Sequence, residues 1–109
     1  MEIRRGDLVT VVLPGDYGKP RPAVIVQSDA FDEIVSLTVL PLTSDLQPAP
    51  LVRLTIEPTP GNGLERRSQI MIDKAATVLR AKIGRHIGRV DSTVMRAVDR
   101  ALLQFLELG

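Results

Sequence analysis

Arg21 stands between two prolines at the start of an apolar run, in the segment Gly18-Lys19-Pro20-Arg21-Pro22-Ala23-Val24-Ile25-Val26. Proline fixes its own φ and drives the residue before it into an extended conformation, so the backbone is stiff on both sides of Arg21. A solvated surface cation needs no such stiffness, whereas a planar guanidinium that must aim two donors at a phosphate does. Arg21 is therefore a candidate phosphate ligand. The structural alternative is a salt bridge from Arg21 to Asp7 or Asp73, and both interpretations stay open.

Thr43 is a second candidate, because it ends the apolar segment Leu40-Pro41-Leu42 with a hydroxyl pair, Thr43-Ser44. A hydroxyl at the end of a strand can hydrogen-bond a phosphoryl oxygen. It can equally bond its own backbone, which is the more common use of threonine at such a position.

An arginine and a threonine suit one reaction, the cleavage of RNA by its own 2′-hydroxyl. That reaction needs the hydroxyl to lose a proton, the charge on the pentavalent phosphorus to be stabilised, and the 5′-oxygen to gain a proton. Arg21 would stabilise the charge and Thr43 would hydrogen-bond the same phosphate. Arginine titrates above about 12, so the residue that accepts the proton is left unassigned.

The sequence lacks the residues that other kinds of functional site require. Metal binding is not expected, because the chain has no cysteine, one histidine and no carboxylates at ligand spacing. His86 is expected to be a partly exposed polar residue. The glycines at 15 and 18 lack the lysine and hydroxyl that bind a triphosphate. Three aromatic residues are too few for a stacking platform of the RNA-recognition-motif type. No cofactor is expected.

Length and composition indicate one globular domain spanning residues 1–109, with 44% apolar and 25% charged residues. The net charge is +1, and 11 of the 14 cations are arginine. Six cations fall between Arg80 and Arg100, where a basic face and an ordinary solvated surface are equally good interpretations. The sequence has no signal peptide and no membrane-spanning stretch, so a cytoplasmic location is expected.

The elements that would position Arg21 and Thr43 are short strands. Alternating or β-branched runs predict strands at 8–13, 23–27, 35–40, 51–56 and 69–73, and 83–90 reads as a glycine-bent strand or turn. The loop 14–20 is either tightly turned or mobile. A helix capped by Asp91 or Ser92 follows, with its apolar face formed by Val94, Val98, Ala101, Leu102 and Phe105. The pattern predicts a mainly β fold: a small antiparallel barrel with a C-terminal amphipathic helix.

Four segments, 5–9, 18–26, 40–44 and 68–74, resemble the MazF/PemK family of toxins, in order along essentially the whole chain. The resemblance implies an SH3-like barrel, a homodimer and metal-independent cleavage of single-stranded RNA. The expected products carry a 2′,3′-cyclic phosphate and a 5′-hydroxyl. The expected partners are a MazE-like antitoxin and, for the toxin–antitoxin complex, operator DNA.

By this resemblance the family's catalytic arginine and threonine fall on Arg21 and Thr43, and the loop 14–20 is a flap beside them. Asp73 and Lys74 match a pair that we interpret as structural. Relatives carry an acidic residue where this chain has a serine before Gln69, which again leaves the general base open. The residues expected to bind RNA are Lys19, Ser44, Arg66, Arg67, Ser68 and Gln69, of which the two arginines could equally be solvated.

Two other functions remain as alternatives. CcdB-type toxins resemble the same barrel but bind DNA gyrase, and are expected to act through a C-terminal Trp-Gly-Ile. This chain shows Glu107-Leu108-Gly109 instead and carries the Arg21/Thr43 pair, which favours the nuclease. The other alternative is a barrel that has no catalytic activity and acts as a DNA-bound corepressor.

Overall fold

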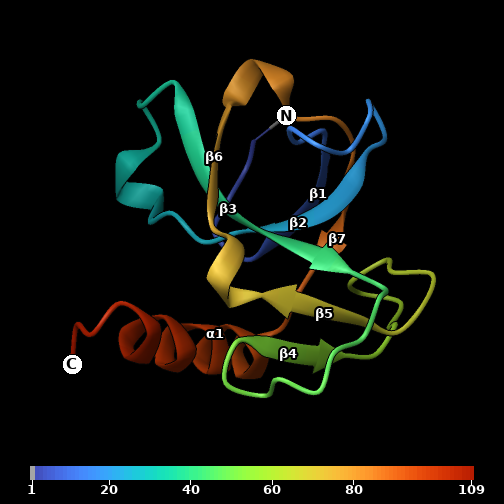
Figure 1. Ribbon diagram of the computed structural model, residues 1–109. Helices are drawn as coiled ribbons and strands as arrows, with labels where there is room; N and C mark the ends of the chain where they lie inside the picture. Colours follow the sequence, from blue (N-terminus) through green and yellow to red (C-terminus); the bar gives the residue numbers. More distant parts are fainter. Residues whose placement is uncertain (1) are drawn as a thin grey trace.

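The computed structural model describes residues 2–109, which fold into short strands and one long helix (Figure 1). Three single-turn 3-10 helices, η1 (Asp29–Phe31), η2 (Ile72–Lys74) and η3 (Arg80–Lys82), connect them. The other elements are β1 (Asp7–Val11), β2 (Arg21–Ile25), β3 (Ser36–Thr43), β4 (Arg53–Ile56), β5 (Ser68–Met71), β6 (Ala76–Leu79), β7 (His86–Arg89) and α1 (Ser92–Phe105).

The strands form one strongly curved antiparallel sheet in the order β4-β5-β3-β2-β1-β7. Its central strand, β3, changes partner along its length: Ser36 to Val39 pair with β6, whereas Leu42 and Thr43 pair with β5. Pro41, which has no N–H to donate, stands where the partner changes. Among residues 2–109 no pairing joins β4 to β7, so the sheet is a half-open barrel. The predicted mainly β fold with a C-terminal helix is confirmed.

The core lies on both faces of the sheet, as the almost wholly apolar β2 requires. Val24 points into the cluster that contains Leu8, Leu40 and Ile70, on the side of α1. Ala23 and Ile25 point into the opposite cluster, which is built from Val9, Val11, Leu37 and Val39. All three β2 residues are buried. Both faces of the hairpin that carries Arg21 are therefore fixed by packing.

The helix α1 begins where the sequence predicts, because the Asp91 carboxylate accepts a hydrogen bond from the Val94 N–H at 2.9 Å. Met95 and Val98 are its buried residues. The predicted packing of Phe105 is wrong: this side chain is 48% exposed, because the last turn of α1 runs past η2 and β4. Within residues 2–109, no helix is long and apolar enough to cross a membrane.

Strand boundaries differ from the predicted ones by up to three residues, and β6 is a strand that the sequence pattern does not predict. Its run Ala76-Thr77-Val78-Leu79 is short and pairs only with β3. The bent strand expected within 83–90 is confirmed as β7. A Cβ at Gly88 would lie 2.3 Å from the Asn62 carbonyl oxygen, so only glycine fits against the loop 57–63.

Candidate functional site

The loop between β1 and β2, which we call the flap (residues 12–20), is tightly turned. The Asp16 N–H donates to the Leu13 carbonyl at 3.1 Å, and the Lys19 N–H donates to the Asp16 carbonyl at 3.0 Å. Gly15, Tyr17 and Gly18 all have positive φ, which two successive tight turns require. Of the two alternatives for this loop, the structure shows the turned one.

Arg21, the first residue of β2, is held by a carboxylate of the flap. Its Nε donates to Asp16 Oδ2 at 2.8 Å and its Nη2 donates to Oδ1 at 2.7 Å. This is the bidentate geometry in which a guanidinium also binds a phosphate. The Asp16 side chain is 11% exposed and that of Arg21 is 34% exposed, so the pair lies at the floor of an open site.

The two salt-bridge partners expected from sequence are wrong, because both carboxylates serve other arginines. Asp7 accepts from Arg89 at 2.8 Å and lies 3.4 Å from the Nε2 of His86, which is 40% exposed, as predicted. Asp73 pairs with Arg53, in agreement with its predicted structural role. The carboxylate that Arg21 uses is five residues earlier in the chain.

Thr43 lies directly across the sheet from Arg21. The β2–β3 register pairs Ile25 with Val39 and Ala23 with Pro41, and continued by two residues it sets Arg21 opposite Thr43 on the same face. The Thr43 hydroxyl accepts a hydrogen bond from the Asp45 N–H at 3.0 Å. The predicted bond to the local backbone is therefore present, and within residues 2–109 the hydroxyl proton has no acceptor.

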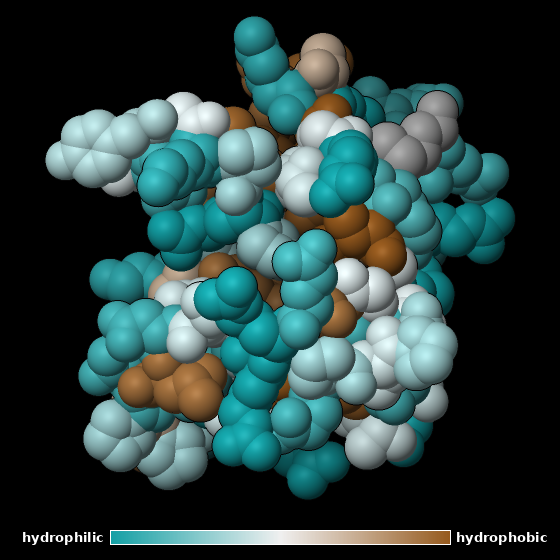
Figure 2. Space-filling model, turned by 90° about the vertical axis from the view of Figure 1, so that its right-hand side faces the viewer, coloured by the Kyte–Doolittle hydropathy of each residue, from teal (hydrophilic) through white to brown (hydrophobic). Residues whose placement is uncertain are grey.

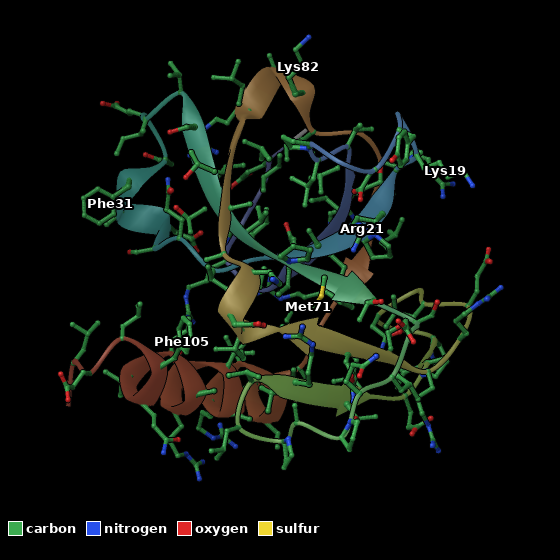
Figure 3. The ribbon with its side chains drawn as sticks, viewed as in Figure 1. Lys19, Arg21, Phe31, Met71, Lys82 and Phe105 are labelled. Carbon is green, nitrogen blue, oxygen red and sulfur yellow. The ribbon has the colours of Figure 1, made fainter. Side chains whose placement is uncertain are left out.

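Arg21 and Thr43 line an open groove. The side of the molecule that Figure 2 shows is mostly hydrophilic, with a few separate apolar patches. The groove consists of two adjoining clefts. One, of about 430 Å³, lies under the flap, and the other, of about 340 Å³, lies beyond Thr43. They share Pro20, Pro22, Leu42, Thr43 and Ser44. Figure 3 shows Lys19 and Arg21 together at this side of the molecule.

The groove carries more positive than negative side chains. Its cations are Lys19, Arg21, Arg66 and Arg85, and its carboxylates are Asp16 and Glu65. Of the six cations between Arg80 and Arg100, only Arg85 lies in the groove. The positive charge of the groove therefore comes from three separate segments of the chain and not from the run between Arg80 and Arg100 alone.

The residues expected to bind RNA divide into two groups. Lys19, Ser44, Arg66 and Ser68 line the groove. Arg67 does not: it is paired with Glu57 at 2.7 Å on the surface. Ser68, which stands where relatives have a carboxylate, is 5% exposed and donates its hydroxyl to the Arg66 carbonyl at 3.0 Å.

Gln69 is beside the groove rather than in it. It pairs with Thr43 across β3 and β5, but it is 5% exposed. Its amide donates to the Gln47 carbonyl at 3.0 Å and accepts from the Gln47 N–H at 2.9 Å, and it also donates to the Thr55 hydroxyl at 3.2 Å. Gln69 therefore ties down the loop that follows Thr43, and it presents no free polar group to a ligand.

Two groove residues escape prediction from the sequence. Asp16 lies in a glycine-rich loop, where an isolated carboxylate has no signature, although its distance of five residues from Arg21 suits a salt bridge across a turn. Arg85 belongs to a segment far from the motifs. Backbone hydrogen bonds between Thr10 of β1 and residues 84 and 85 place it at the groove. Its N–H donates to the Thr10 hydroxyl at 2.8 Å.

A larger cleft, of about 870 Å³, lies between the start of α1 and the loop 57–62. It contains none of the predicted site residues, and its two arginines are already paired, Arg5 with Asp99 and Arg89 with Asp7. The groove is therefore the stronger candidate. Over residues 2–109 there is no group of three ligating side chains that could hold a metal ion.

Comparison with known proteins finds relatives that match almost the whole chain. The chain is 50% identical over 108 residues to a protein named probable endoribonuclease MazF from Mycolicibacterium smegmatis, covering 98% of this chain and 99% of the relative. The structure of this chain resembles that of Mycobacterium tuberculosis toxin MazF-mt6. The TM-score is 0.80 at 21% identity, over 94% of this chain and 98% of the other.

Another similar structure is a mycobacterial endoribonuclease in complex with its cognate antitoxin, with a TM-score of 0.80 at 20% identity over 99% of this chain and 98% of the other. The family described as PemK-like, MazF-like toxin of type II toxin–antitoxin system matches residues 4–106. On the strength of that match and of the curated relative, the chain belongs to the PemK-like, MazF-like toxin family.

Proposed function

We propose that this toxin is an endoribonuclease that cleaves single-stranded RNA at short sequences, without a metal ion, by attack of the substrate's own 2′-hydroxyl. The observation that carries the proposal is that Arg21, whose guanidinium already binds a carboxylate bidentately, lines the same open groove as Thr43. The name of the 50% identical relative supports the same activity. The same evidence makes the gyrase-binding alternative the weaker one.

Substrate binding begins with an exchange of partners at Arg21. A phosphodiester entering the groove offers two oxygens with the geometry of the Asp16 carboxylate, so it takes over the guanidinium. Thr43 then donates its hydroxyl proton to a phosphoryl oxygen. The exchange leaves the Asp16 carboxylate free to accept a hydrogen bond from the substrate.

Asp16 is accordingly the general base in this scheme, in the place of the carboxylate that Ser68 does not supply. The 2′-oxygen bonds to phosphorus while its proton passes to Asp16. The bond from phosphorus to the 5′-oxygen breaks, that oxygen takes a proton from water, and Asp16 returns its own proton to the solvent. Arg21 and Thr43 stabilise the charge that builds on the phosphoryl oxygens between these events. The products are a 2′,3′-cyclic phosphate and a 5′-hydroxyl.

Replacing Thr43→Val, which is nearly isosteric, is expected to lower the cleavage rate at least about tenfold, or about 1.4 kcal/mol of transition-state stabilisation. Thr43→Ser keeps the hydroxyl and is the matched control, with a rate within about threefold of wild type in the same single-turnover assay. A Thr43→Val rate within about twofold of wild type would reduce Thr43 to the backbone contact with Asp45.

A homodimer is part of the proposal, and an exposed apolar patch around Arg80 supports it. The Arg80 side chain donates to the carbonyls of Ile34 and Phe31, and its N–H donates to that of Val35. The patch consists of Phe31, Ile34, Val35 and Leu79, which are 54%, 47%, 72% and 51% exposed. Covering it with a second copy would remove these side chains from water.

We expect sedimentation at micromolar concentration to give a species of about 24 kDa, twice the 11.9 kDa of the chain. Val35→Asp places a charge in the patch and should shift the protein to monomer. Leu51→Asp is the control, because Leu51 is similarly exposed (69%) but lies between β3 and β4. A wild-type monomer, or equal effects of the two variants, would contradict this interface.

The cognate antitoxin is the second proposed partner, since one of the similar structures is a complex of that kind. A disordered acidic segment would complement the four cations of the groove and hold the toxin off RNA. Operator DNA binding would then belong to the complex. A cytoplasmic location, where RNA and antitoxin are both available, is also proposed.

The proposed activity is tested by incubating the antitoxin-free protein with a long unstructured RNA in excess EDTA and mapping every cut. Cuts confined to one short sequence are expected from wild type. An intact RNA after incubation with folded protein would refute the proposal and favour a non-catalytic role of the barrel.

A further inference from the structure

The tip of the flap presents an aromatic side chain to solvent. Tyr17 is 98% exposed, although the backbone around it is held by two turn hydrogen bonds and by the double contact of Asp16 with Arg21. Tyr17 has φ +53°, a conformation that bulky residues rarely adopt and that glycine or asparagine would adopt with less strain. The fold therefore maintains an exposed tyrosine in a costly conformation with no packing in return.

We propose that Tyr17 stacks on an unpaired base of the RNA next to the phosphate bound by Arg21. The inference rests on the proposed function and adds a recognition element to it. Tyr17 lines the same cleft as Arg21 and Thr43 and follows Asp16 directly in sequence. A base on either side of the phosphate at Arg21 is thus within reach of its ring, and aromatic rings bind unpaired bases in this way in many single-strand binding proteins.

No other tyrosine, phenylalanine or tryptophan among the described residues lies at the groove. The chain has one tyrosine, two phenylalanines and no tryptophan. Figure 3 shows Phe31 and Phe105 on the side of the molecule opposite Lys19 and Arg21. Lys19, two residues after Tyr17, adds a cation at the mouth of the same cleft. The flap therefore combines a ring for a base with a charge for the backbone, which is the combination that single-stranded RNA requires.

Because Tyr17 is the only tyrosine and tryptophan is absent, the intrinsic fluorescence of the protein reports on this one ring. The probe is a single-stranded RNA of the mapped cut sequence with a 2′-deoxynucleotide at the cut, which prevents cleavage. We expect it to quench the tyrosine emission as it binds. The same RNA with an abasic ribose next to the cut should bind without quenching.

Affinity is measured separately, by anisotropy of the same RNA carrying a dye. Tyr17→Ala should weaken binding about tenfold to hundredfold, and Tyr17→Phe, which keeps the ring, should stay within about threefold of wild type. Both variants should fold normally, since the side chain is almost wholly exposed. Equal losses in both variants, or RNA binding without quenching, would overturn the stacking proposal.

The failure of this inference is distinguishable from failure of the proposed function. A protein that cleaves RNA and binds the probe, but shows neither quenching nor an effect of Tyr17→Ala, refutes only the stacking. A protein that neither cuts nor binds any RNA refutes both. Quenching by the antitoxin and not by RNA would assign Tyr17 to a protein interface and overturn its role in RNA recognition.

Discussion

Arg21→Ala is expected to abolish RNA cleavage, with a loss of at least about 1,000-fold, or about 4 kcal/mol in the transition state. Arg21 provides two donors and a full charge to the phosphoryl oxygens, and no neighbouring side chain can replace both. Single-turnover kinetics measure the loss, and circular dichroism with thermal melting verifies the fold. Because the Arg21 side chain is one-third exposed and, within residues 2–109, pairs with Asp16 alone, the fold should persist.

Two further variants show which property of Arg21 is responsible for the loss. Arg21→Lys keeps the charge but not the planar fork, and should retain a small part of the activity, about 10- to 100-fold below wild type. Arg96→Ala removes an exposed arginine of α1 whose side chain bonds only Thr93, and should leave the rate unchanged. Full activity of Arg21→Ala would exclude the proposed site altogether.

Asp16→Asn is expected to lower the cleavage rate at least about 100-fold, because the amide cannot take the proton of the 2′-hydroxyl. Two effects contribute to the loss. The base is missing, and an uncharged amide binds the Arg21 guanidinium more weakly than the Asp16 carboxylate does. RNA affinity separates them. Loss of the base alone should leave the binding of an RNA with a 2′-deoxynucleotide at the cut unchanged, whereas a displaced Arg21 should weaken that binding.

Asp45→Asn is the matched control for Asp16→Asn. It removes one exposed carboxylate close to Thr43 but outside the groove, and it preserves the backbone N–H that bonds the Thr43 hydroxyl. Its rate should stay within about twofold of wild type, with the affinity for the deoxy-substituted RNA unchanged. If Asp16→Asn is slow and also binds that RNA more weakly to the same extent, Asp16 positions Arg21 and is not the base.

The sequence predicts those parts of the fold that follow from local patterns. The apolar run at 23–25 requires cover on both faces, the Asp91 carboxylate caps a helix, and Arg21 and Thr43 are marked by prolines and by a strand end. The structure then brings the two together, since the segments 23–25 and 39–41 pair in antiparallel register and Arg21 and Thr43 follow at the same end of that pairing. The positions expected to do chemistry therefore meet in the structure.

Properties that depend on tertiary contacts do not follow from the sequence. The carboxylate that meets Arg21 is decided by how the flap turns, which leaves Asp16 closer than Asp7 or Asp73. Gln69 has the composition of a ligand-binding residue, but burial beneath the loop 44–50 directs its amide to Gln47. The strand β6 exists because β3 offers it an edge, and its short sequence carries no comparable signal.

The central claim is most directly tested by the chemistry of the RNA ends. Wild-type protein in excess EDTA, given a short RNA containing the mapped cut site, should release products that mass spectrometry identifies as a 2′,3′-cyclic phosphate and a 5′-hydroxyl. The same RNA with a 2′-deoxynucleotide at the cut should remain intact. Products ending in a 3′-hydroxyl and a 5′-phosphate, or cleavage of the deoxy-substituted RNA, would show that the 2′-hydroxyl is not the nucleophile.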